Sequence, residues 1–332
     1  MDIVILDGHV ANPGDLSWDA IASQGSLTVY DRTAPADVVA RAGRAEALFV
    51  NKIVLTADII DRLPHLRFIG ELATGYNNID IEAARRRGIV VSNVPAYSGD
   101  SVAQTVFALL LELTNRVGRY DASVRAGAWA SCADFSYTLG PITELAGLTM
   151  GIYGLGNIGS KVAAVAHALG MRVVSSTSKD ADAIAPYVEK VSFDEMVACA
   201  DVISVNAPLT AANRGLFSGA VFRRMKPTAL LINTARGTLI DPEALVNGLE
   251  SGKIGAAGLD VVENENGLFY FNHMGDALQN RELAMLRSFP NVIFTPHTAF
   301  YTDVNVASMV ESAFKAVRAM ADGEQTPLEV RL

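Results

Sequence analysis

The sequence has little of what marks secreted, membrane-spanning or disulfide-rich proteins. Its 332 residues include only two cysteines, Cys132 and Cys199, which are far apart and outside any metal-ligand spacing. Such a pair predicts reduced thiols and a cytoplasmic protein. No apolar run approaches the roughly 18 residues that cross a bilayer. The first residues, MDIVILDG, lack a basic leader and are typical of a β-strand, so we expect neither secretion nor a membrane partner.

Positive charge is also scarce. Lys and Arg number 27 against 36 Asp and Glu, which gives a net charge of −9. The largest basic cluster, 85–87, precedes Gly88 at the end of a predicted helix, where cations complement the helix dipole. Proteins that bind nucleic acid usually present a basic face, so we expect no such partner. Four of the five histidines lie outside any ligand-spaced cluster, so the sequence predicts no metal: His9, His65, His167 and His273.

Hydrophobic residues are abundant, at 50% of the chain, and they follow a regular order. The length is about twice a ~150-residue domain, which predicts two domains. Short β-branched runs alternate with helical patterns such as Ile81–Arg87 and Ser160–Leu169. This alternation predicts an α/β fold with parallel sheets covered by helices. The expected strands are Ile3–Leu6, Ala47–Val50, Phe68–Gly70, Ile89–Ser92, Met150–Tyr153, Arg172–Ser175, Val202–Val205, Leu230–Asn233 and Val292–Phe294.

The longest helical pattern starts near Gly99 and continues through VAQTVFALLLELTNRVGRY. Asp100 or Ser101 is the expected N-cap. The helix is apolar around most of its circumference and should therefore be buried on all sides. We expect it to serve as a hinge between domains, a subunit contact, or both.

A glycine-rich turn predicts a nucleotide site. The strand MGIY leads into Gly154, Gly156 and Gly159, and an amphipathic helix follows. In the G-x-G-x-x-G pattern the glycines permit a tight turn, close approach of a pyrophosphate and close helix packing. The helix start, with Asn157 and Ile158, supplies N–H groups to the phosphates. This context predicts dinucleotide binding.

The acidic residue that usually holds the adenosine ribose, about 20 residues further on, is missing. The strand after the glycine turn ends in Thr177, Ser178 and Lys179. None of these repels a 2′-phosphate, and Lys179 can pair with one. The sequence therefore favours NADPH over NADH, or use of both. The alternative is a solvated turn, with the ribose held elsewhere.

Polar groups follow three later strands: Arg236, then Asp260 and Glu265, then His297. Ligands of open α/β sheets bind at the carboxyl ends of strands. At this point the chain resembles the D-isomer-specific 2-hydroxyacid dehydrogenase family, from about residue 66 to about residue 304. The resemblance rests on seven motifs in family order, ATGYNNID, NVPAYS, GLGNIGSKVA, NAPLT, INTARGTLID, AAGLDVVENE and TPHTAF.

The resemblance implies a catalytic set that suits the reduction of a 2-keto acid. Arg236 would hold the substrate carboxylate and polarise the carbonyl through its planar fork. His297 would protonate the developing alkoxide, and Glu265 would partner this histidine and fix its tautomer. Hydride would come from a nicotinamide cofactor.

Further roles are implied by the same resemblance. Asp260 would lie near the nicotinamide amide, with a strand-end cap as the alternative. Thr74 and Gly75 would receive the substrate carboxylate on backbone N–H groups. Tyr97 and Phe300 would line the substrate pocket, although aromatics at strand ends are as often simple core. Asn206, Ala207 and Pro208 would lie along the cofactor, with a simple turn inside the domain as the alternative. Thr234 and Ala235 are the remaining implied cofactor contacts.

The resemblance also implies the domain plan. A Rossmann-like cofactor domain, 99–296, would be inserted into a flavodoxin-like substrate domain made of 1–98 and 297–332. The active site would lie in the cleft between these domains, and closure would exclude water. The family commonly forms homodimers through the cofactor domain, for which the apolar helix after Gly99 is a consistent contact.

The substrate stays open at this level. The front half is similar to glycerate dehydrogenase and hydroxypyruvate reductase. The back half, with GLFYFNH and FPNVIFTPHTAFYTD, is similar to D-lactate and D-2-hydroxyisocaproate dehydrogenases. Pyruvate, hydroxypyruvate, glyoxylate and bulkier 2-keto acids all fit. Two rival functions remain on the same fold: a dinucleotide-sensing, corepressor-like protein, and an enzyme of the formate or phosphite dehydrogenase type.

Overall fold

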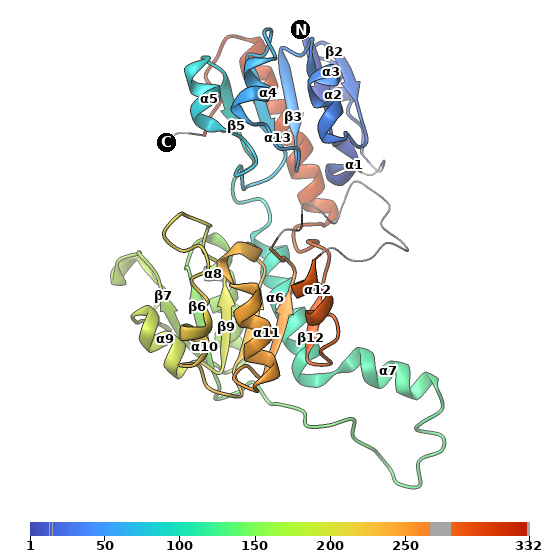
Figure 1. The fold of residues 1–332 in the computed structure, drawn as a ribbon, viewed down its shortest axis with the longest axis vertical. Helices are drawn as coiled ribbons and strands as arrows, with labels where there is room; N and C mark the ends of the chain where they lie inside the picture. The colour runs from blue at the N-terminus through green and yellow to red at the C-terminus, as the bar shows by residue number, and fades with distance from the viewer. Residues whose placement is uncertain (13, 15, 264, 266–279, 331–332) are drawn as a thin grey trace. The chain divides into compact units, whose positions relative to one another are not determined.

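The computed structural model describes residues 1–12, 14, 16–263, 265 and 280–330, so the GLFYFNH motif and His273 lie outside the described residues. Contacts divide the chain into two compact units (Figure 1). Unit 1 comprises Met1–Tyr97 and Tyr301–Leu332, and unit 2 comprises Ser98–Phe300. The chain thus leaves unit 1 once and returns once. The boundary expected from the sequence, 296/297, lies just before the observed return at Tyr301.

Unit 1 is built on a five-stranded parallel sheet in the order β2-β1-β3-β4-β5. This is the flavodoxin-like order. The strands are β1 (Asp2–Ile5), β2 (Ser26–Val29), β3 (Ala47–Val50), β4 (Phe68–Glu71) and β5 (Val90–Ser92). Strands β3 and β4 are buried at every position, as continuous apolar runs predict. Helices cover the sheet: α1 (Gly8–Ala11), α2 (Asp19–Ala22), η1 (Pro35–Asp37), α3 (Val38–Ala42), α4 (Ala57–Asp61), α5 (Ile81–Arg86) and α13 (Asp303–Ala321).

Unit 2 is built on a seven-stranded parallel sheet in the order β12-β11-β10-β9-β6-β7-β8. This is the doubly wound dinucleotide-binding order with one further edge strand, and it confirms the predicted α/β class. The strand order reverses between β6 and β9, which is where such sheets bind ligands. The strands are β6 (Thr149–Tyr153), β7 (Arg172–Ser176), β8 (Val188–Lys190), β9 (Val202–Val205), β10 (Leu230–Asn233), β11 (Ala256–Leu259) and β12 (Val292–Phe294).

Helices lie on both faces of this second sheet (Figure 1). They are α6 (Gly99–Asn115), α7 (Val117–Arg125), α8 (Asn157–Ala168), η2 (Ala181–Ala183), α9 (Phe193–Cys199), α10 (Gly219–Phe222), η3 (Gly237–Leu239), α11 (Pro242–Glu250) and α12 (Arg281–Leu286). In the part of the chain that the structure describes, no helix has both the length and the hydropathy needed to cross a membrane.

Helix α6 buries most of its apolar side chains within its own unit, but Leu111 is 36% exposed, so the expectation of burial on all sides was wrong. It packs against α8 and the strands β10, β11 and β12, with Val106 and Leu110 completely buried. The expected N-cap was wrong: the helix starts at Gly99, so Ser98 takes that position. Its apolar circumference is therefore explained mainly by the core of unit 2. By contrast, α7 contains no buried residue.

Candidate active site

The three glycines of the turn between β6 and α8 are required for different reasons. Gly154 has a φ of +90°, and a Cβ there would lie 2.7 Å from Cα of Ala207. A Cβ on Gly159 would overlap the carbonyl oxygen of Gly154. A Cβ on Gly156, however, would meet no described atom within 4 Å. The outer two glycines are therefore required by the protein's own packing, whereas the middle one borders open space.

The polar atoms around this turn fit a dinucleotide. The open space at Gly156 adjoins the start of α8, where helix N–H groups lack intrahelical partners and favour phosphate. Two further oxygens at neighbouring strand ends are buried and have no hydrogen-bond partner among the described residues: Oδ1 of Asn206 after β9 and Oγ1 of Thr234 after β10. Leaving such atoms unpaired costs roughly 1–3 kcal/mol each. A bound cofactor would supply their missing partners.

The predicted adenosine end of the site lies at the carboxyl end of β7. The Oγ1 atom of Thr177 accepts a hydrogen bond from the backbone N–H of Lys179 at 3.2 Å. Ser178 and Lys179 are exposed. A residue that the sequence did not single out, Lys190 of β8, donates from Nζ to the carbonyl oxygen of Lys179 at 2.5 Å. Pro208, in the turn after β9, is exposed.

The turn after β10 presents Arg236. The completely buried side chain of Asn233 accepts from the N–H of Ala235 at 3.0 Å and donates to the carbonyl oxygen of Arg236 at 2.9 Å. Arg236 itself is half-buried, and its Nη1 donates to the carbonyl oxygen of Ala235 at 2.7 Å. Within the described part of the chain its guanidinium forms no ion pair. Sequence reasoning missed Asn233, although an amide at a strand end is a recognisable turn signal.

His297 and Glu265 lie side by side. Nδ1 of His297 is 3.0 Å from Oε1 of Glu265, and the two side chains are 23% and 26% exposed. The Phe300 ring stands edge-on to the imidazole, with ring centroids 6.3 Å apart. Arg236, Glu265 and His297 follow β10, β11 and β12, which are neighbouring parallel strands, so all three belong to one edge of the sheet. No direct bond joins Arg236 to the other two.

A buried carboxylate fixes the backbone around His297. Asp260, 1% exposed, accepts on Oδ1 from Oγ1 of Thr295 at 2.5 Å and from the N–H of Thr298 at 2.9 Å. Its Oδ2 accepts from the N–H of Ala299 at 3.0 Å. His297 has a φ of +54°, which is uncommon for a residue other than glycine. These contacts match the capping role that was the alternative to a cofactor contact for Asp260.

The predicted substrate residues of unit 1 lie in the segments that follow β4 and β5. Thr74 follows β4, donates from Oγ1 to the carbonyl oxygen of Val94 at 2.8 Å, and accepts from Nδ2 of Asn93 at 2.7 Å. Among the described residues, nothing accepts from the backbone N–H groups of Thr74 and Gly75. Such groups suit a carboxylate. Tyr97, half-buried, is the last residue of this segment of unit 1.

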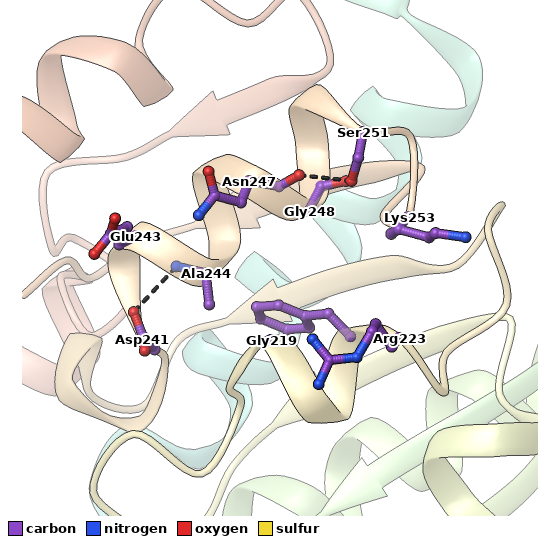
Figure 2. A pocket seen from close by; sticks show the side chains of 10 residues that line it. Gly219, Arg223, Asp241, Glu243, Ala244, Asn247, Gly248, Ser251 and Lys253 are labelled. Carbon is purple, nitrogen blue, oxygen red and sulfur yellow. Dashed lines mark hydrogen bonds between the residues drawn. The ribbon is translucent and has the colours of Figure 1, made fainter.

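A groove of about 420 Å³ between α10 and α11 contains none of the predicted site residues. Figure 2 shows Arg223 and Lys253 on its rim and Asp241 at the start of α11. The two cations are exposed, and Asp241 caps α11 by accepting from the N–H of Ala244 at 3.0 Å. The groove therefore has no buried, unassigned polar group. The described residues also contain no cluster of three or more His, Cys, Asp or Glu side chains that would hold a metal ion.

A doubly wound sheet with a phosphate-binding glycine turn and a paired histidine at one edge defines a dinucleotide-dependent oxidoreductase. The family model "D-isomer specific 2-hydroxyacid dehydrogenase, NAD binding domain" matches residues 107–299. Hydroxypyruvate reductase from Blautia hydrogenotrophica is 40% identical over 272 residues, which cover 80% of this chain and 84% of that protein. The chain belongs to the D-isomer-specific 2-hydroxyacid dehydrogenase family, whose members are nicotinamide-dependent oxidoreductases acting on CH–OH groups.

Solved structures agree with this assignment. D-lactate dehydrogenase from Aquifex aeolicus, complexed with NAD and lactic acid, has a TM-score of 0.85 and 29% identity, over 98% of this chain and 96% of that one. The acyclic imino acid reductase Bsp5, in complex with NADPH and D-Arg, has a TM-score of 0.83 and 26% identity, with both chains completely covered. The cofactor of this chain is thus a nicotinamide dinucleotide.

Two alanine variants separate packing from cofactor binding in the glycine turn. Gly159→Ala should lower the free energy of unfolding by roughly 2 kcal/mol, because its Cβ overlaps a backbone oxygen. Gly156→Ala should leave stability nearly unchanged but weaken cofactor binding, because its Cβ enters the open space. Denaturant unfolding and fluorescence titration of the reduced cofactor measure the two effects. Unchanged cofactor affinity in Gly156→Ala would place the phosphates elsewhere.

Asp260→Asn should disturb the His297 turn. An amide nitrogen in place of one carboxylate oxygen would face a backbone N–H, which leaves a buried donor unpaired and costs about 2 kcal/mol. We expect a lower denaturant midpoint and a changed imidazole environment in the NMR spectrum of His297. Asp180→Asn, an exposed change in the same unit, is the control. A wild-type midpoint in Asp260→Asn would contradict the capping role.

Proposed function

We propose that this protein reduces small 2-keto acids, hydroxypyruvate foremost, to the D-2-hydroxy acids, with NADPH as the preferred hydride donor. The observation that carries the proposal is the His297–Glu265 pair, 3.0 Å apart, at the same carboxyl edge of the sheet as Arg236, which forms no ion pair with any described residue. The choice of hydroxypyruvate is supported by the front-half motifs and by the similarity to hydroxypyruvate reductase.

The proposed mechanism assigns one task to each side chain. Arg236 holds the substrate carboxylate and polarises the keto group, because two parallel N–H donors match a carboxylate and no anion among the described residues pairs with the guanidinium. His297 donates a proton to the carbonyl oxygen as negative charge develops there. Glu265 accepts from Nδ1 of His297, which leaves Nε2 as the proton donor. The reduced nicotinamide supplies the hydride. Within unit 1, the backbone N–H groups of Thr74 and Gly75 are the proposed anion-binding groups.

The residues after the carboxyl end of β7 support the proposed preference for NADPH. An acidic residue there would accept from the ribose hydroxyls of NADH and repel a 2′-phosphate. Thr177 and Ser178 offer hydroxyl groups instead, and Lys179 adds a positive charge. The proposed cofactor contacts after β9 and β10 are Asn206, Ala207, Thr234 and Ala235.

We further propose a homodimer through the cofactor unit, with α7 and residues 126–146 as the contact rather than α6. Apolar side chains of this segment are strongly exposed: Phe135 by 92% and Ile142 by 60%. Phe135→Glu should therefore shift a dimer toward monomer in light scattering, whereas Val165→Glu, a comparable change on α8 of the same unit, should not. A monomeric wild-type protein would contradict the proposal.

A kinetic panel tests the function. The wild-type protein should oxidise NADPH, and NADH less efficiently, with hydroxypyruvate, glyoxylate and pyruvate as acceptors. His297→Ala should lower kcat by at least about 100-fold, because the proton donor is lost, while the Kd of the reduced cofactor stays within about twofold. His167→Ala, in the helix after the glycine turn, is the matched control.

Each rival function predicts a different pattern of turnover in the kinetic panel. Turnover of formate or phosphite without any keto acid activity would support an enzyme of the formate or phosphite dehydrogenase type. Cofactor binding without turnover of any acceptor would support a dinucleotide sensor. Full activity in His297→Ala would remove this histidine from the mechanism.

A further inference from the structure

Lys190 lies outside every sequence motif, yet its ammonium group lies at the predicted ribose turn. Strand β8 pairs in parallel with β7, and the register places Lys190 beside Ser175, one residue before β7 ends. The hydrogen bond from Nζ to the carbonyl oxygen of Lys179 then fixes the position of the ammonium group. The side chain therefore extends along the sheet edge to the turn at 177–179.

This turn carries two lysines, and no carboxylate among the described residues forms an ion pair with either of them. The backbone N–H of Lys179 closes the turn on Thr177, and the bond from Lys190 brings a second lysine to the same turn. Asp180 and Asp182 follow, but among the described residues neither forms an ion pair with either lysine. An ammonium has three N–H donors, and Lys190 uses one of them on a backbone oxygen. Two donors remain available for an anion.

We propose that Lys190, together with Lys179, binds the 2′-phosphate of NADPH and is a specificity-determining residue for the cofactor. The inference rests on the proposed use of NADPH. The 2′-phosphate is the group that distinguishes NADPH from NADH, and a phosphate dianion gains charge-assisted hydrogen bonds from both ammonium groups. A 2′-hydroxyl is neutral and gains little from the second lysine. Lys190 should therefore strengthen the binding of NADPH but not that of NADH.

Calorimetric titration with fragments of the cofactor tests this without catalysis. The wild-type protein should bind adenosine 2′,5′-bisphosphate more tightly than adenosine 5′-monophosphate. Lys190→Gln should weaken binding of the bisphosphate about tenfold and leave the monophosphate within about twofold. Lys190→Arg should retain most of the difference, because the charge is kept. Added salt should reduce the difference in the wild type. Lys315→Gln, an exposed lysine of α13 in unit 1, is the control.

The outcomes separate this inference from the proposed function. Undiminished selectivity in Lys190→Gln would overturn the role of Lys190, and so would an equal loss for both fragments. Neither result would affect keto acid reduction in the kinetic panel. A wild-type protein that fails to distinguish the fragments would overturn both the NADPH preference and this inference, again without bearing on keto acid turnover.

Discussion

The turn that carries His297 depends on the carboxylate buried beneath it. Asp260 follows β11, and both of its carboxylate oxygens accept from the turn after β12, while its own carbonyl oxygen accepts from the N–H of His297 at 2.9 Å. A left-handed conformation at a histidine costs free energy and persists only where the surroundings hold it. Charge-assisted hydrogen bonds to backbone N–H groups are among the strong ones, so a single side chain supplies much of that support. The pairing of His297 with Glu265 is a consequence of this constraint.

Parallel strands then place the remaining groups. Because β10, β11 and β12 are neighbours with all carboxyl ends at one edge, a cation, a carboxylate and an imidazole arise from three turns that are far apart in sequence. Each turn is held by its own local polar group. Asn233 holds the Arg236 turn as Asp260 holds the His297 turn. The proposed reactive side chains are thus supported by buried residues whose polar atoms bond to the backbone of the same turns.

Much of this arrangement could be predicted from the sequence, because the apolar runs and glycine patterns are strong signals. Strands β3, β9, β10 and β12 begin and end where the runs do. Strands β2 and β8 were not predicted, since they are short edge strands with mostly exposed side chains and hence no apolar pattern. The roles of Asp260 and Lys190 depend on contacts across 35–39 and 11 residues, which no local pattern encodes. Likewise, the apolar circumference of α6 does not reveal whether its own unit or another subunit buries it.

The strand order also separates the proposed 2′-phosphate site from the proposed proton donor. Lys179 follows β7 and Lys190 lies on β8, on one side of the reversal between β6 and β9, whereas His297 follows β12, the outermost strand on the other side. The glycine turn at the reversal is the element that a dinucleotide shares with both sides. Charges at β8 can therefore change without disturbing the hydrogen bonds of Asp260, which belong to β11 and β12. Under the proposed assignment, exposed residues beside β7 and β8 set the cofactor preference, while the buried residues that hold the His297 and Arg236 turns stay the same.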